Sequence, residues 1–310
     1  MLIEKKATKI NNEYLEYKYF SSARNALFRI LESLAAEGTY TLFLPMYIGY
    51  SPKEGSGIYD PVCRLRIPHV FYPFNENLEV DISCLEDLLC KVSGNKVFLF
   101  VHYFGYVDPS YKQLIYMLRQ HNVMIIEDYA HAFYTHLVDG KCGEGDCGFY
   151  SFHKMLPFPD GGAAVTSNPE SIWWKQVVSE QEPYPFYHYN LKKIADKRKK
   201  NAECWEQRLE SDERIKILRT QTDYKNQTAQ SFPILLKGAD RFRVYTQMND
   251  LGFGTISLYH TMIDPIQHLN NVNTLRISRS ILNLPVHQDI GEEEIQSMYE
   301  ALTEIIQKNM

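Results

Sequence analysis

The sequence lacks the features that mark zinc proteins, membrane proteins and secreted proteins. Its six cysteines form no CxxC pair and no cluster with histidine, so no zinc site is indicated and no metal is expected. Scattered cysteines of this kind favour a reduced, cytoplasmic protein. No apolar run is long enough to span a membrane, and the N-terminal residues MLIEKKATKINNEY lack the apolar segment of a signal peptide.

An excess of positive charge is also missing. Lysine and arginine number 33 against 38 acidic residues, a net charge of -5, so we expect no general attraction to nucleic acid. The single basic run, KKIADKRKK at 192–200, distributes its charges around a helix and is interpreted as a solvated surface. No GxGxxG follows the first strand, which argues against a dinucleotide-binding dehydrogenase.

Strand and helix patterns alternate along the first half of the chain. Such alternation is typical of right-handed βαβ units and predicts an α/β fold with a mostly parallel sheet covered by helices on both faces. The predicted strands are 39–45, 70–74, 96–105, 123–128, 147–153 and 162–167, and the predicted helices are 20–37, 81–92 and 109–122.

The pattern changes after residue 167. We expect a long polar helix, a small group of strands and further helices, at 190–210, 232–237, 239–251, 254–259, 281–285 and 292–307. The chain is therefore predicted to have a large domain, 1–205, and a smaller C-terminal α/β domain, 206–310.

Polar residues follow two of the predicted buried strands, where parallel sheets bind their ligands. Asp128 ends the strand 123–128, and His131 comes three residues later. Asp128 fits either a helix cap or a partner for a ligand cation. Lys154 follows the strand 147–153 among apolar neighbours, where desolvation would lower its pKa and favour Schiff-base chemistry. A lysine that extends to solvent is the alternative.

The segment FSSARN at 20–25 opens the first helix. Free N–H groups, two serine hydroxyls and an arginine there predict a phosphate cradle, with simple helix capping as the alternative. A ligand with a phosphate, an electrophilic carbonyl and a ring nitrogen that needs an anion would use this segment together with the lysine and the aspartate. Pyridoxal phosphate (PLP) is such a cofactor.

These segments resemble the DegT/DnrJ/StrS family of PLP-dependent sugar aminotransferases, which have the aspartate-aminotransferase fold, fold type I. The similarity extends from about residue 18 to the C-terminus. The segments that carry it are SSARNAL, VHYFGYVDP (101–109), IIEDYAHAF (125–133), GDCGFYSFHK with the following DGG (145–162), and LNLPVHQDIGEEEI (282–295).

The resemblance implies roles for individual residues. Lys154 would hold PLP as a Schiff base and then move a proton, and Asp128 would pair with the ring nitrogen. His131 would lie near the phenolic oxygen of the ring. Tyr47 or Tyr50 would stack on the ring, and the sequence does not choose between them.

The resemblance also implies a phosphate site and a second subunit. Ser22, Ala23 and Ser151 would hold the phosphate, together with Arg24, which stands where the family usually has threonine. Family members build their active sites at a homodimer interface. The segment PFYHYNLKK (185–193) would serve there, with His188 or Asn190 reaching the partner's phosphate.

The expected reaction moves an amino group from an amino-acid donor such as glutamate to a keto sugar, nucleotide-linked in the family. Its products would serve polysaccharide or secondary-metabolite biosynthesis. Two alternatives stay open. One is a PLP-dependent sugar dehydratase, which His153 beside Lys154 would suit. The other is a non-catalytic binding or regulatory protein with the same fold.

Overall fold

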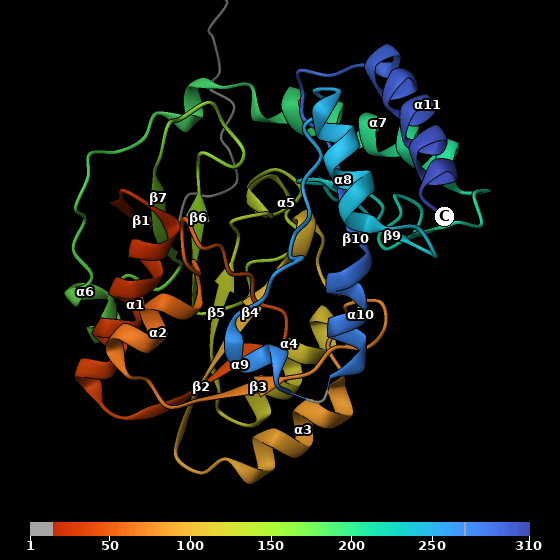
Figure 1. Ribbon diagram of the computed structural model, residues 1–310. Helices are drawn as coiled ribbons and strands as arrows, with labels where there is room; N and C mark the ends of the chain where they lie inside the picture. Colours follow the sequence, from red (N-terminus) through yellow and green to blue (C-terminus); the bar gives the residue numbers. More distant parts are fainter. Residues whose placement is uncertain (1–14, 270) are drawn as a thin grey trace, which may run out of the picture.

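A seven-stranded sheet forms the centre of the computed structural model, which describes residues 15–269 and 271–310 (Figure 1). The expectation that no signal peptide is present concerns residues 1–14, which lie outside this part. The sheet order is β1 (Glu16–Phe20), β7 (Gly162–Thr166), β6 (Cys147–Ser151), β5 (Met124–Asp128), β4 (Asn95–Val101), β2 (Tyr40–Pro45) and β3 (His69–Tyr72). Only β7 runs against the others, so the predicted mostly parallel sheet is confirmed.

Helices connect these strands, and side-chain caps define where several of them begin. Helix α1 (Ala23–Glu37) starts at Ser22, whose hydroxyl accepts the N–H of Asn25 at 3.2 Å. Helix α3 (Ile82–Lys91) starts at Asp81 in the same way. The remaining helices of this region are α2 (Tyr59–Leu65), α4 (Tyr111–Gln120), α5 (Phe133–Leu137) and α6 (Ile172–Gln176).

A second, three-stranded antiparallel sheet follows the long helix α7 (Leu191–Leu209). Its order is β10 (Ile281–Leu284), β9 (Phe232–Leu236) and β8 (Ile215–Ile217). Figure 1 shows β9 and β10 with α7, α8 (Arg241–Asp250) and α11 (Glu292–Lys308) at the upper right, beside the larger sheet. Helices α9 (Asp264–Gln267) and α10 (Val272–Ser280) lie closer to β2 and β3 in the same view.

Two predicted strands were wrong in extent. The strand expected at 254–259 is reduced to one isolated bridge between Ile256 and Asn283. The N–H of Leu258, two residues further on, donates to the Asn283 side chain instead of to a strand backbone. The strand expected at 96–105 ends at Val101, and a short 3₁₀ helix, η1 (Tyr103–Gly105), follows it. Phe104 and Gly105 both have positive φ angles, which no strand accommodates.

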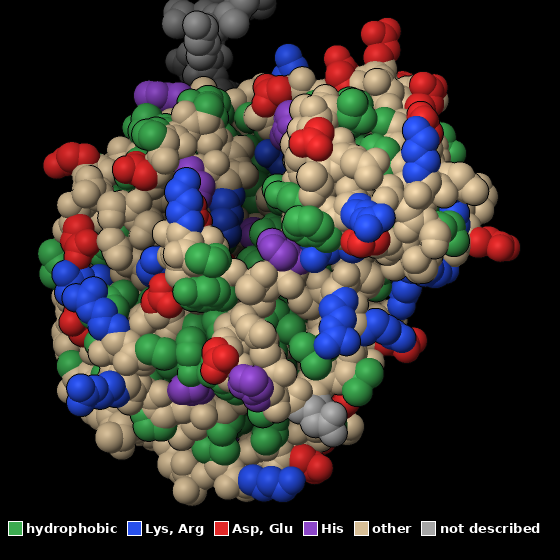
Figure 2. Space-filling model, in the orientation of Figure 1, with side chains coloured by type: hydrophobic (Ala, Val, Ile, Leu, Met, Phe, Trp, Pro, Cys, Tyr) green, Lys and Arg blue, Asp and Glu red, His purple; other side chains and the backbone are tan. Residues whose placement is uncertain are grey.

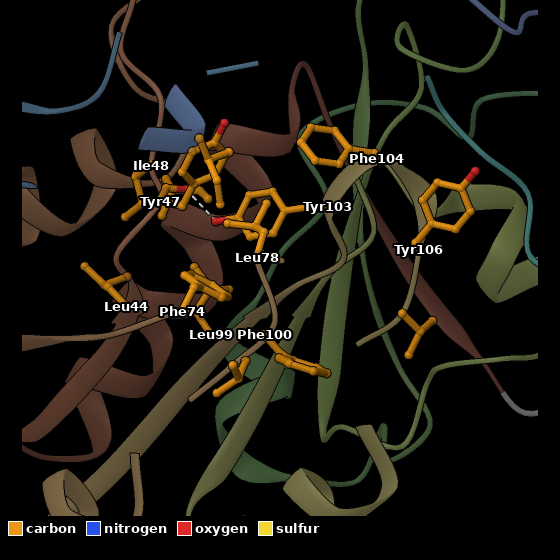
Figure 3. Packing of buried hydrophobic residues seen from close by; sticks show 14 of the residues in the cluster. Leu44, Tyr47, Ile48, Phe74, Leu78, Leu99, Phe100, Tyr103, Phe104 and Tyr106 are labelled. Carbon is orange, nitrogen blue, oxygen red and sulfur yellow. Dashed lines mark hydrogen bonds between the residues drawn. The ribbon is translucent and has the colours of Figure 1, made fainter. Parts of the chain in front are cut away.

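Aromatic packing fixes the carboxyl ends of β2 and β4 against each other. Figure 3 shows Tyr47 and Ile48, just after β2, together with Phe74 and Tyr103. The Tyr103 hydroxyl donates a hydrogen bond to the Tyr47 carbonyl, and the two rings meet edge to face at 5.4 Å. The loops at this edge of the sheet are therefore anchored in the core. Within the described residues, no helix combines the length and the apolar character needed to cross a bilayer.

Candidate functional site

The ends of β1, β5 and β6 meet at one edge of the large sheet. Ser151, the last residue of β6, pairs with Gly162 at the start of β7. Gly162 in turn packs so closely on the start of α1 that a Cβ atom at this position would lie 2.4 Å from the backbone nitrogen of Ala23. Ser22, Ala23 and Ser151, which were all predicted to bind phosphate, are thus brought together.

The start of α1 has free hydrogen-bonding capacity at this point. Among the described residues, no acceptor takes the backbone N–H groups of Ala23 and Arg24. The hydroxyls of Ser21 and Ser22 accept from Asn25 and keep their own protons to donate. This set of donors at a helix N-terminus fits a phosphate group.

Lys154 lies beside His131 at the same edge. The Lys154 Nζ atom is 3.2 Å from the Nε2 atom of His131, and the backbone N–H of Phe104 donates to Nδ1 of the same ring at 3.3 Å. Burial, reinforced by the charge of Lys154, holds the pKa of His131 well below its usual range. The neutral form of the ring is therefore favoured, and its Nδ1 atom accepts the Phe104 N–H.

Asp128 completes this group from the end of β5. Its Oδ1 accepts the N–H of Ala130 at 2.7 Å, and no other hydrogen bond to it exists within the described residues. Burial raises the pKa of Asp128, opposed by the charge of Lys154. Burial likewise lowers the pKa of Lys154, opposed by Asp128. Both groups would be stabilised in their charged forms by a ligand that supplies the opposite charge.

Lys154 is nevertheless exposed along part of its length. Figure 2 shows a hollow in the molecular surface between the two sheets' regions, and lysine or arginine side chains gather there with histidines. An amine that is partly desolvated by its surroundings but reachable from solvent, as Lys154 is, is suited to covalent chemistry with a carbonyl. The donors at α1, the Lys154 amine and the open Asp128 carboxylate together fit PLP.

Three other residues with expected roles, Arg24, Tyr47 and Tyr50, have the following surroundings, and their roles at the cofactor stay predictions. The Arg24 guanidinium contacts the Glu54 carbonyl and lies 3.5 Å from the Asp60 carboxylate, so its charge is directed away to the loop after β2. Tyr47 is fully buried and Tyr50 is exposed. The Tyr47 hydroxyl already has two hydrogen-bond partners. It donates to the Leu258 carbonyl at 2.9 Å and accepts the backbone N–H of Tyr259 at 2.8 Å.

Two further predictions concern Asn190 and His153. Asn190 caps α7 by accepting the N–H of Lys193 at 3.0 Å, and its expected reach into a partner subunit stays a prediction. His153 is exposed, with Nδ1 3.5 Å from the Ser151 hydroxyl, whereas His131 is the histidine next to Lys154. The arrangement therefore offers no particular support for His153 as a replacement for the lysine.

Tyr259 is the residue of the site that sequence reasoning missed. Its ring lies near-parallel to that of His131, with centroids 6.4 Å apart and 26° between the planes. The Asp128 charge adds to burial in raising the pKa of Tyr259. No sequence signal marks this tyrosine, because it belongs to a non-repetitive segment more than a hundred residues beyond Lys154.

A buried polar network lies next to the site. Glu127, fully buried, accepts from the ring Nε2 of His102 at 2.7 Å and from the Tyr111 hydroxyl at 3.0 Å. With Cys142 these groups approach the arrangement of a metal site. Burial and the Glu127 charge hold the pKa of the Cys142 thiol well above its usual range, so the thiol stays protonated. The hydrogen bonds of Glu127 to His102 and Tyr111 satisfy these polar groups in the core.

The model of the DegT/DnrJ/EryC1/StrS aminotransferase family matches residues 62–178 and 189–303, as the sequence resemblance predicted. A search of curated proteins by sequence finds no match.

Solved structures share the fold of the chain at low sequence identity. Spr1654 from Streptococcus pneumoniae in its PLP form superimposes with a TM-score of 0.77 at 15% identity, covering 94% of this chain and 87% of that one. NtdA from Bacillus subtilis with bound cofactor PMP (pyridoxamine phosphate) gives 0.73 at 18%, covering 94% and 73%. Helicobacter pylori PseC, an aminotransferase involved in pseudoaminic acid biosynthesis, gives 0.72 at 14%, covering 94% and 87%. The expected fold type I architecture is confirmed.

Proposed function

Since this chain belongs to the DegT/DnrJ/EryC1/StrS aminotransferase family, we propose that it moves an amino group from an amino-acid donor such as glutamate to a keto sugar. One observation carries the proposal: the Lys154 amine lies 3.2 Å from a neutral His131, beside an Asp128 carboxylate with an open oxygen. This is the combination that a PLP-dependent transferase needs at its reacting centre.

The cofactor supplies an electrophilic carbonyl and a ring that withdraws electrons from the bonds at the substrate carbon. The protein's own groups do the rest. Ser22, Ala23 and Ser151 would bind the phosphate of the cofactor. Asp128 holds a proton on the ring nitrogen, because its buried carboxylate gains most from a cationic partner.

Lys154 is proposed to act twice. Its lowered pKa increases the neutral fraction of the amine, which is the form that attacks a carbonyl. The Nζ atom would also be placed to take a proton from the Cα atom of the amino donor and to return it during the transfer. His131 orients the amine through Nε2 and, being neutral, does not add a repelling charge.

The finer description follows the family resemblance. We propose a nucleotide-linked keto sugar as acceptor, in polysaccharide or secondary-metabolite biosynthesis, and a cytoplasmic location. We further propose a homodimer with shared sites, in which Asn190 reaches the partner's phosphate. Exposed aromatic residues such as Tyr187 in the segment before α7 support an interface there. The proposed division of the chain remains 1–205 and 206–310.

The test combines the cofactor with one variant. PLP added to the protein should give the visible absorbance of a lysine adduct, which borohydride fixes on Lys154. L-glutamate should then convert the absorbance to that of the pyridoxamine form. Lys154→Ala should lose both signals, and Lys308→Ala, which changes an exposed lysine at the end of α11, should lose neither. A Lys154→Ala protein that still converts with glutamate would exclude the mechanism.

A further inference from the structure

The chain crosses from the second sheet to the end of β2 through the segment 258–263. Tyr50 donates its backbone N–H to the Thr261 carbonyl at 3.0 Å, and Ile263 donates to the Ile48 carbonyl at 3.0 Å. These bonds join the segment to the residues just after β2 as a short antiparallel pair. The segment is thus fixed at the edge of the sheet that carries the site.

Tyr259 is held within this segment from three sides. Its N–H donates to the Tyr47 hydroxyl at 2.8 Å, and its carbonyl accepts from the Ser278 hydroxyl at 2.8 Å. Its ring lies directly on Gly49, where a Cβ atom would be 2.0 Å from the ring carbon Cδ1. The direction of the ring is therefore set by the backbone and by the absence of a side chain at residue 49.

The ring lies beside the site residues. It lies 6.4 Å from the His131 ring, and His131 touches Lys154. No hydrogen bond links the Tyr259 hydroxyl to any other residue in the described ranges, although the side chain is half-buried. A half-buried phenol with an uncommitted hydroxyl is a typical ligand-binding group, with an apolar face and a polar tip.

The sheet order separates Tyr259 from the phosphate. Ser22 and Ser151 lie at the ends of β1 and β6, on one side of β5. Tyr259 docks just after β2, on the other side of β5 and beyond β4. A phosphate held at the first position and a reacting carbon held at Lys154 leave the side of Tyr259 for the substrate.

We propose that Tyr259 is a binding residue for the sugar ring of the acceptor, and so helps to determine specificity. The inference rests on the proposed function. The aromatic face packs against the C–H face of the sugar, and the hydroxyl forms a hydrogen bond with a sugar hydroxyl. Gly49 is also required for this binding site, because the side chain of any larger residue there would displace the Tyr259 ring.

Two stable probes separate the sugar from the cofactor. Pyridoxamine phosphate fills the cofactor position alone, and N-phosphopyridoxyl-glucosamine adds a sugar ring at the reacting position. Their dissociation constants are measured by calorimetry on the PLP-free protein, for the wild type, Tyr259→Phe and Tyr259→Leu. Leucine keeps apolar bulk for folding but lacks the flat face, and circular dichroism verifies the fold of each variant.

We expect the wild type to bind the sugar conjugate more tightly than pyridoxamine phosphate. Tyr259→Leu should reduce this preference by about three- to tenfold and leave the affinity for pyridoxamine phosphate unchanged. Tyr259→Phe should keep the larger part of it. An undiminished preference in Tyr259→Leu, or an equal loss for both probes, overturns the inference alone. A wild-type protein that binds neither probe overturns the proposed function, and the inference with it.

Discussion

Gly162→Ala should weaken cofactor binding through its phosphate. A Cβ atom at residue 162 would lie 2.4 Å from the Ala23 nitrogen and from the Ser22 carbonyl carbon. The start of α1 would have to move by about 1 Å to restore ordinary contact, which hydrogen bonds of 2.7–3.2 Å do not tolerate. Loss of one bond to a charged group, about 1.5–3 kcal/mol, weakens PLP roughly ten- to a hundredfold. Overpacking should also lower the free energy of unfolding by about 1–3 kcal/mol.

The assay compares PLP with pyridoxal, which lacks the phosphate. Both are titrated into the protein while the absorbance of the lysine adduct is followed, and the ratio of their affinities isolates the phosphate contribution. Gly57→Ala is the matched control, because a Cβ atom there meets nothing within 4 Å. If Gly162→Ala keeps the wild-type ratio, the start of α1 does not hold the phosphate.

Three other changes test neighbouring parts of the site. Arg24→Ala should alter the free energy of unfolding by less than about 1 kcal/mol, since its ion pair with Asp60 is exposed. A tenfold loss of PLP affinity in this variant would show that Arg24 binds the phosphate. Asp128→Asn should shift the pH midpoint of Schiff-base formation downward, because the Asp128 carboxylate raises the pKa of Lys154 toward the ordinary 10.5. Stopped-flow pH profiles of the variant that coincide with those of the wild type would contradict this. Burial raises the pKa of Glu127, but its hydrogen bonds lower it overall, so Glu127→Gln should cost about 1–3 kcal/mol at pH 7 by urea unfolding. The stability difference between the wild type and Glu127→Gln should disappear as the pH falls below 4.5, the pKa of the unfolded chain, and through the lowered pKa of folded Glu127.

The strands of the large sheet were predictable because burial on both faces leaves continuous apolar runs in the sequence. VMIIED and KVFLFV are such runs, and they place Asp128 correctly at the end of β5. Strand β1, EYKYF, alternates aromatic and charged residues at the sheet edge and was missed. Strand β8 has only three residues, too few for a periodic pattern.

The substrate side of the site could not be predicted in the same way. Tyr47 and Tyr50 stood at the right strand end, but the structure places Tyr259 between Tyr47 and His131. This contact joins residues 212 apart in the chain through the Tyr259 N–H and the Tyr47 hydroxyl. Local pattern carries no information on such pairs, because they depend on how the second sheet packs against the first.

Glu127 and Asp128 are adjacent at the end of one strand, but only Asp128 belongs to the candidate site. Adjacent residues of a strand face opposite sides of the sheet, so the two carboxylates enter different surroundings. Glu127 meets His102, Tyr111 and two backbone N–H groups, and every partner lowers the cost of its burial. Asp128 accepts one hydrogen bond within the described part of the chain and stays buried. A buried carboxylate with an open oxygen costs stability unless a cation completes it, which explains why Asp128 and not its neighbour belongs to the site.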